Sequence, residues 1–240
     1  MKFVSTKPLS LLAASLLMSS MSHAALIDFT DRSMWGTSGS GAVTKDYDGM
    51  QVTLQAFNAA GATSYTNTAF DGLDRSVCGS LACQSDGIGI AGDEVTFGLE
   101  RLSVTFSEAV NVQSIWVLDL FGAMGGDSAG AEVFQVAANG LGGEWASWIG
   151  TDMGGGGGLF TATLDNATAL STGTMFTSVW SLDFFVHDLG AFIVPANSDF
   201  ALGGLEVTSV SVPEPGTLGL LTLGLLGALG ATRRRNATRS

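Results

Sequence analysis

The chain has 240 residues, with 22 acidic side chains against ten lysines and arginines and a formal net charge of −12. So acidic a chain repels phosphate, which excludes nucleic-acid binding as its function. With segments at both ends set aside, the length suffices for one well-buried core.

The first 24 residues have the pattern of a secretory signal peptide. Lys2 and Lys7 precede an apolar stretch over 9–18, and a small-residue cleavage site ends at Ala24. The stretch is too short to span a bilayer, which disfavours the alternative of an N-terminal anchor. We therefore expect export through the Sec machinery and a mature chain that begins at Ala25, outside the reducing cytosol.

Near the other end, an uncharged segment at residues 216–232 is followed at once by three arginines. As a helix this segment spans about 25 Å, which just reaches across a hydrocarbon core. Basic residues beside a span stay on the cytoplasmic side. The sequence therefore predicts a transmembrane helix with the domain outside and a basic tail, 236–240, inside. The absence of a polar face disfavours the alternative, a buried core helix.

A Pro-Glu-Pro triplet stands just before that segment. The triplet, the Gly- and Leu-rich apolar stretch and the arginines follow in this order over residues 212–235, and together they resemble the PEP-CTERM protein-sorting domain of Gram-negative bacteria. The residues that carry the resemblance are Val212, Pro213, Glu214, Pro215, Arg233, Arg234 and Arg235. Tails of this kind also bear the label ice-binding protein C-terminal domain, which says nothing about the core.

The resemblance implies delivery rather than chemistry. In that family an integral membrane transpeptidase, exosortase, recognises the motif, and the substrate leaves the inner membrane for the cell surface or an exopolysaccharide matrix, as in a biofilm. Two prolines deny helix to Glu214 and its neighbours, so the region to be cut stays extended at the membrane surface. The alternative is a permanent anchor, which would make the chain a type I membrane protein.

Residues 25–211 are left as a single domain, and they read as short strands separated by Gly, Asn and Asp. Residues 102–107 alternate apolar and polar side chains, and a polar turn at 108–111 leads into an apolar run over 112–121, which predicts a hairpin. No window has a long helical period. We therefore expect a single antiparallel β-sandwich of the jelly-roll type. Further strands are expected at residues 51–57, 132–137, 159–164, 178–187 and 200–211.

Cys78 and Cys83 are the two cysteines of the chain. A zinc site needs four ligands, and the chain has no second cluster that could supply the others. In an exported protein we therefore expect a small-loop disulfide between them.

Carboxylates beside this loop form a candidate calcium site. Asp86, Asp93 and Glu94 surround a glycine-rich turn, and calcium takes six to eight oxygen ligands from flexible loops. The alternative is that they are solvated turn residues. A second segment, Asp46–Gly49, has the start of a calcium loop but lacks the later ligands of an EF-hand. No other cofactor is expected.

One motif favours an enzyme. Residues 126–130 match the G-x-S-x-G pattern of a nucleophile elbow, with Ser128 as nucleophile and His187 as the single histidine left in the mature chain. An elbow needs a strand, a sharp turn and a helix, whereas the residues after Ser128 alternate like a strand. We therefore expect a non-enzymatic protein, with a secreted hydrolase that uses Ser128 or a carboxylate pair as the alternative.

Five tryptophans raise carbohydrate stacking as a function. Trp145 and Trp148 are three residues apart, which on a strand places them on opposite faces. Trp116 and Trp180 stand in apolar runs and are expected in the core. The sequence thus predicts an exported cell-surface or matrix protein with a structural or ligand-binding role, and it leaves the ligand open.

Overall fold

The structure is a computed structural model of the chain. It describes residues 24–70, 78–90, 92, 94–120, 131–140, 145–149, 160–163, 176–187 and 198–210, the segment 160–163 by its backbone alone. These residues lie in one compact unit, His23–Val210. Its elements are β1 (Ala24–Asp28), α1 (Arg32–Trp35), β2 (Ser38–Ser40), β3 (Val43–Tyr47), β4 (Met50–Asn58), β5 (Gly61–Thr66), β6 (Val95–Thr96), β7 (Arg101–Leu118), β8 (Val133–Ala138), β9 (Trp145–Ile149), β10 (Phe160–Thr163), β11 (Val179–Phe185) and β12 (Asp199–Ser209).

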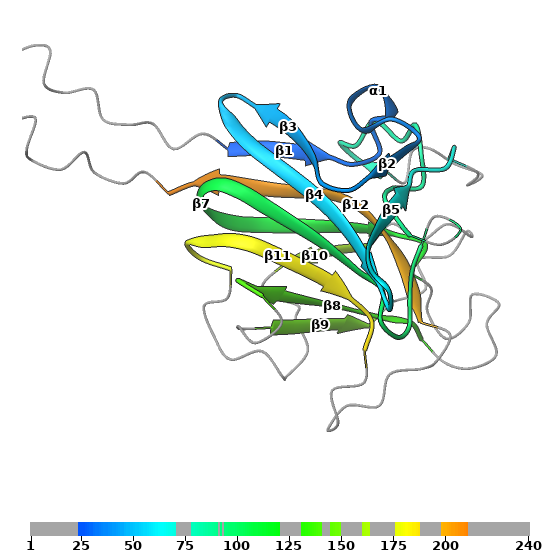
Figure 1. Cartoon of the computed structure of the whole chain (residues 1–240). Helices are drawn as coiled ribbons and strands as arrows, with labels where there is room; N and C mark the ends of the chain where they lie inside the picture. The colour runs from blue at the N-terminus through cyan, green and yellow to red at the C-terminus, as the bar shows by residue number, and fades with distance from the viewer. Residues whose placement is uncertain are drawn as a thin grey trace, which may run out of the picture. The chain divides into compact units, whose positions relative to one another are not determined.

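All of these strands belong to one antiparallel hydrogen-bonded network (Figure 1). The main path runs β2-β5-β4-β7-β11-β8-β9; β3 pairs with β4, β10 and β12 pair with β7, and β1 and β6 pair with β12. The predicted all-β, antiparallel class is confirmed. Because the described strands form one open sheet, the two separate sheets of a sandwich stay a prediction.

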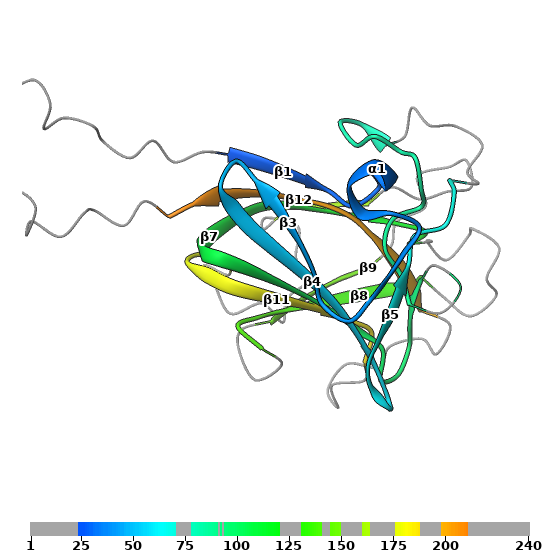
Figure 2. The same cartoon turned by 45° about the horizontal axis from the view of Figure 1, so that its top comes forward.

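β7 is the longest strand, and it occupies the place where the sequence predicts a hairpin. That prediction is wrong, because the chain runs through residues 108–111 without reversing. These residues include no Gly or Pro, and none has a positive φ, so nothing favours a tight turn. Ala109 and Val110 are both buried, which breaks the alternation. Before this point β7 pairs with β4 and β11; beyond it β7 pairs with β12 and β10. Figure 2 shows β12 and β11 on the two sides of β7.

The other five predicted strands are confirmed as β4, β8, β10, β11 and β12, with ends that differ by one or two residues. In β4 and the first half of β7, every second side chain is buried, as in Val52, Leu54, Val104 and Phe106. The main core therefore lies against one face of β4 and of the first half of β7, whereas every residue of β8 is buried. Burying one such side chain stabilises the fold by roughly 1.5–3 kcal/mol.

The short helix α1 ties the N-terminal strands to this core. Asp31 caps it, since the Asp31 carboxylate accepts hydrogen bonds from the backbone of Ser33 and Met34. Trp35 is buried, and its indole N–H donates to the Asp28 carbonyl at 3.0 Å and the Tyr47 hydroxyl at 3.1 Å.

Burial raises the pKa of Tyr47 to about 12, with smaller contributions in the same direction from Asp28 and Asp31, while the hydrogen bond with Trp35 opposes the rise. Tyr65 donates from its hydroxyl to the Trp35 carbonyl at 2.7 Å. Burial raises the pKa of Tyr65 as well. Both phenols therefore favour the protonated form in the folded protein.

The first and last strands of the unit lie side by side. β1 pairs with β12 in a register that sets Ala24 opposite Thr208 and Asp28 opposite Gly204. The predicted signal-peptide cleavage before Ala25 therefore falls at the start of β1. Among the residues that the structure describes, no helix is long and apolar enough to cross a membrane. The predicted span at 216–232 lies outside these residues, as do residues 1–23.

Candidate ligand-binding site

A row of side chains crosses the face of the sheet that is opposite to the core. Directly paired residues of antiparallel strands point to the same side, and Arg101 pairs with Phe185, which pairs with Gln135. Along their strands, Arg101 and Phe185 alternate with the core residues Leu102 and Phe184. The complete row, from β4 to β9, is Phe57, Arg101, Phe185, Gln135 and Ser147.

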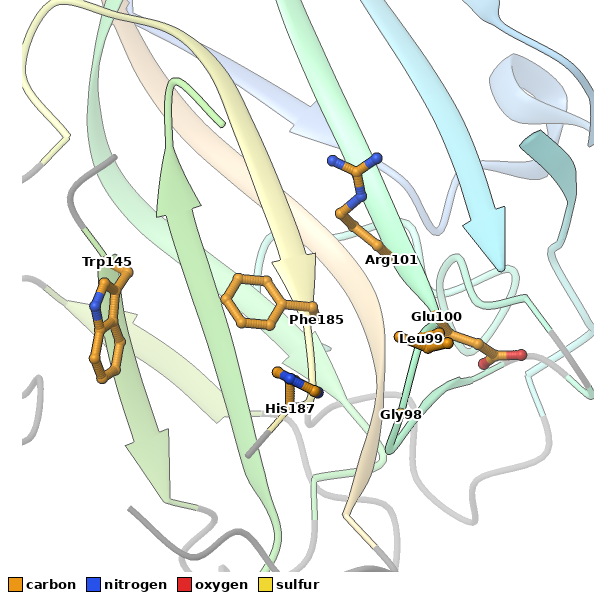
Figure 3. Close-up of a pocket in the computed structure, with 7 residues that line it drawn as sticks. All are labelled: Gly98, Leu99, Glu100, Arg101, Trp145, Phe185 and His187. Carbon is orange, nitrogen blue, oxygen red and sulfur yellow. The ribbon is translucent and has the colours of Figure 1, made fainter. Parts of the chain in front are cut away.

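A pocket of about 300 Å³ lies at this row. The volume is at the lower end of ligand pockets, roughly 300–1,000 Å³. Figure 3 shows that Phe185 extends from β11 toward β9, which carries Trp145, and that His187 lies beside Phe185. Leu99, in the turn before β7, is 67% exposed. The lining among the described residues is Gly98, Leu99, Glu100, Arg101, Trp145, Phe185 and His187.

Two contacts hold the cation of the pocket in place. A nitrogen of the Arg101 guanidinium lies 3.2 Å from the carboxylate of Asp183, whose side chain is 3% exposed. The contact is an ion pair without hydrogen-bond geometry, since this oxygen of Asp183 has no hydrogen-bond partner. The guanidinium carbon also stands 4.3 Å from the centre of the Phe57 ring, within cation–π range. Asp183 thus offsets the positive charge of Arg101.

The acid of the pocket and the histidine are also anchored through neighbouring atoms. One carboxylate oxygen of Glu100 accepts from the backbone N–H and the hydroxyl of Thr96, both at 2.9 Å. The backbone N–H of His187 donates to the amide oxygen of Gln135 at 2.8 Å. Gln135 is fully buried, and its amide nitrogen has no hydrogen-bond partner among the described residues. The pocket therefore combines aromatic walls with polar groups of fixed position.

Beside the pocket, the same face of the sheet carries a band of uncharged polar side chains, here called the polar lane. Thr53 pairs with Thr105, and Thr105 with Ser181, while the hydroxyls of Thr44 and Thr53 are 2.8 Å apart. These side chains are exposed or half-buried. The polar lane consists of Thr44, Thr53, Gln55, Ser103, Thr105 and Ser181.

The positions of the tryptophans agree with the alternation of strand residues for Trp145 and Trp148, but not for Trp180. Trp145 and Trp148 both lie on β9 and on opposite faces, as expected: Trp145 lines the pocket, and Trp148 is buried and stacks on Phe134 with ring centres 5.0 Å apart. Trp116 is half-buried against a smaller apolar cluster. The expectation that Trp180 is in the core is wrong, because its side chain is 54% exposed.

The predicted calcium ligands are only partly described. Asp86 is buried and Glu94 is half-buried, while Asp93 lies outside the described residues. Among the described residues, no group of three carboxylate, histidine or cysteine side chains could hold a metal ion. The calcium site therefore stays a prediction. Asp46–Gly49 closes the β3–β4 hairpin, where the Asp46 carboxylate accepts from the Gly49 N–H at 3.0 Å. That segment is thus a structural turn.

Cys78 and Cys83 are joined by a disulfide, with Cα atoms 6.0 Å apart. Both cysteines are buried, and with Leu81, Leu118 and Ala201 they form a small apolar cluster of their own. Two hydrogen bonds join the loop to β1 and to the residues just after it. Thr30 accepts from the Cys83 N–H at 2.8 Å, and the Asp28 carboxylate accepts from the Ala82 N–H at 2.6 Å. The loop therefore closes on the sheet.

Ser128 lies outside the described residues, so the structure does not place it relative to His187, which is exposed. Of the residues that line the pocket, Trp145 and His187 stand out in the sequence, whereas Arg101 and Phe185 do not. The scarcity of basic residues could have pointed to Arg101, one of four in the predicted domain. Phe185, in a run of apolar residues, gave no such signal.

The sorting residues Val212–Pro215 and Arg233–Arg235 also lie outside the described residues. Comparison with known proteins accounts for them: residues 211–235 match a family model described as the PEP-CTERM protein-sorting motif. The resemblance is therefore confirmed, and the chain carries the motif of exported proteins that exosortase processes at the membrane. No curated protein and no solved structure matches the chain.

Proposed function

We propose that this chain is a non-enzymatic protein of the cell surface or the exopolysaccharide matrix, released by exosortase and equipped with a ligand-binding domain. The sorting motif at 211–235 is the single observation that carries the proposal. The signal-peptide pattern of residues 1–24 and the disulfide agree with a chain that works in an oxidising compartment.

The route begins with Sec-dependent export and a stop in the inner membrane. We infer that residues 216–232 cross this membrane as a helix, with the arginines on the cytoplasmic side. β12 ends at Ser209, two residues before the motif begins. Such a short connection keeps the domain at the membrane surface until the chain is cut near Pro215. Cleavage then frees it for the surface or matrix.

The pocket supports binding rather than catalysis. Its described lining supplies a histidine, a carboxylate and a guanidinium, but no hydroxyl or thiol nucleophile. Arg101 is neutralised by Asp183, and the Glu100 carboxylate is engaged by Thr96. Neither group has a second carboxylate in the described lining with which it could act as an acid–base pair. We further infer that the two halves of β7 belong to two packed layers, which would make the domain a β-sandwich.

Intact-mass analysis of the protein from the producing cells and from their extracellular fraction tests the proposal. We expect an N-terminus at Ala25 and a C-terminus near Pro215 in the extracellular fraction. The variant Glu214→Ala should accumulate in the membrane fraction at the uncut mass, while Glu206→Ala, before the motif, should be processed normally. Retention of residues 216–240 in the wild-type protein would contradict processing and favour the permanent anchor. Ester hydrolysis that Ser128→Ala abolishes would favour the hydrolase.

A further inference from the structure

We propose that the pocket and the polar lane together bind a neutral polysaccharide, with one sugar ring seated against Trp145 and Phe185 and the following rings along the lane. The proposal rests on the extracellular, ligand-binding role proposed above, and it names the class of ligand. Its three supports are the chemistry of the pocket, the continuity of the lane with the pocket, and the charge of the chain.

The chemistry of the pocket matches that of a sugar ring. A pyranose presents C–H groups on its faces and hydroxyls around its edge, so it needs an apolar platform and polar partners at the margin. Trp145 supplies aromatic surface, and Leu99 and the small exposed part of Phe185, which is 6% exposed, extend it. Glu100 and Arg101 supply an acceptor and donors at the margin. A purely apolar ligand would cover the second Glu100 oxygen and the exposed part of the Arg101 guanidinium without offering either a hydrogen bond, which disfavours it.

The polar groups are held in position before a ligand arrives. Arg101 is fixed by Asp183 on one side and by the ring of Phe57 on the other. Glu100 is fixed by two hydrogen bonds from Thr96 through one oxygen, and its second oxygen can accept from a sugar hydroxyl. Side chains that are already ordered lose little conformational entropy when they bind a ligand. The pocket is thus suited to a ligand with hydroxyls at fixed positions.

The polar lane continues the same face away from the pocket. Ser103 and Thr105 follow Arg101 at every second residue of β7, so all three point to one side. Paired strands lie about 4.8 Å apart, and alternate residues of one strand about 6.7 Å apart. Hydroxyl and amide groups therefore recur at close intervals in two directions. An extended chain rich in hydroxyls can form hydrogen bonds with such a surface at several successive sugars.

The negative charge of the chain favours a neutral polysaccharide over an anionic one. Residues 25–212 hold 21 acidic and four basic side chains, a formal charge of −17. One of the four basic residues is Arg101, which Asp183 already neutralises. An anionic polysaccharide would be repelled by this surface, whereas the uncharged side chains of the lane impose no such cost on a neutral polymer.

Affinity electrophoresis and titration of the purified full-length chain with defined polysaccharides test the proposal. The neutral probes are a β-glucan, dextran and a galactan; the acidic probes are alginate and hyaluronan. We expect retardation by at least one neutral probe and by neither acidic probe. Trp145→Ala should raise the Kd by at least about tenfold. Gln113→Ala, at an exposed position of β7 outside the pocket and the polar lane, should leave the Kd within about twofold.

A second pair of variants examines the lane. Thr105→Arg should weaken binding, whereas Gln113→Arg, at an exposed position of β7 outside the lane, should not. If Trp145→Ala lowers the melting temperature, the variant Trp145→Leu is tested in its place, because leucine keeps apolar volume but removes the ring. Failure of every neutral probe to bind, binding of acidic probes alone, or equal losses in Trp145→Ala and Gln113→Ala would overturn the proposal. A correctly processed extracellular protein that binds no glycan would refute this inference while leaving the proposed function standing.

Discussion

Arg101 and Asp183 are diagonal neighbours on β7 and β11, and their charged groups approach to 3.2 Å although one side chain is 27% exposed and the other 3%. The buried carboxylate thus depends on a cation that also lines the pocket. Loss of the arginine would leave an uncompensated charge inside the protein. The stability of the sheet and the shape of the pocket are therefore linked through this pair.

Arg101→Leu should destabilise the fold by about 3 kcal/mol or more, because it leaves the buried Asp183 carboxylate without its cation. Asp183→Asn should cost less, since Arg101 can turn toward solvent. The double variant Arg101→Leu/Asp183→Asn should recover much of the loss, because no uncompensated charge is then left inside the protein. Urea unfolding measures all three, with Arg32→Leu on α1 as the control for a lost positive charge. A cost below about 1 kcal/mol for Arg101→Leu would show that the pair behaves like a surface ion pair.

Tyr47 gives the fold a dependence on alkaline pH. Its pKa is raised from 10.0 to about 12, mainly by burial. Between these values the unfolded chain releases the phenolic proton and the folded protein keeps it, so stability is full below pH 10 and falls as pH rises toward 12. Melting temperatures from pH 9 to 12 should therefore decline more steeply in the wild-type protein than in Tyr47→Phe. Parallel curves would contradict a role for Tyr47.

The disulfide should contribute measurably to stability despite its short loop. Constraint of an unfolded loop of this length is worth about 2 kcal/mol in the chain-entropy model. Replacing both Cys78 and Cys83 by serine should lower the free energy of unfolding by about that amount, and a reducing agent should have the same effect on the wild-type protein alone. Ser80→Ala, within the loop, is the control. Unchanged stability under reduction would mean that the bond adds nothing.

Calcium should raise the melting temperature if Asp86, Asp93 and Glu94 bind it together. Ligands that bind only the folded protein stabilise it by mass action. We expect a rise in millimolar calcium that is lost in Asp93→Ala and in Asp86→Asn, and retained in Asp48→Asn at the β3–β4 turn. Equal melting curves with calcium and with a chelator would leave these carboxylates as turn residues.

Much of the strand pattern could be predicted from local alternation, but partner choice could not. β4 and the first half of β7 alternate cleanly, since one of their faces meets the core. Residues 108–111 have the pattern of a polar turn, and the sequence does not show that the strand continues there and changes partners. In contrast, Asp48 and Gly49, both with positive φ, form the tight β3–β4 turn. This Asp-Gly pair is a strong hairpin signal that a calcium reading obscured.

The pocket was harder to predict, because its walls come from segments far apart in the chain. Leu99, Trp145 and His187 meet only because β7 pairs with β11, β11 with β8, and β8 with β9. No spacing within the sequence encodes that arrangement. The apolar neighbours of Trp180 predict a core position, yet the register shift after Val179 leaves its side chain exposed.

The pairing of β1 with β12 has a consequence for the timing of folding. β1 enters the extracytoplasmic space first and its partner enters near the end, about 180 residues later, so the first strand cannot complete its hydrogen bonds until almost all of the chain has been translocated. Pairings between distant segments are the slow steps of folding. β1 and β12 can therefore pair only when the residues just before the sorting motif have been exported, so this pairing is completed late in export.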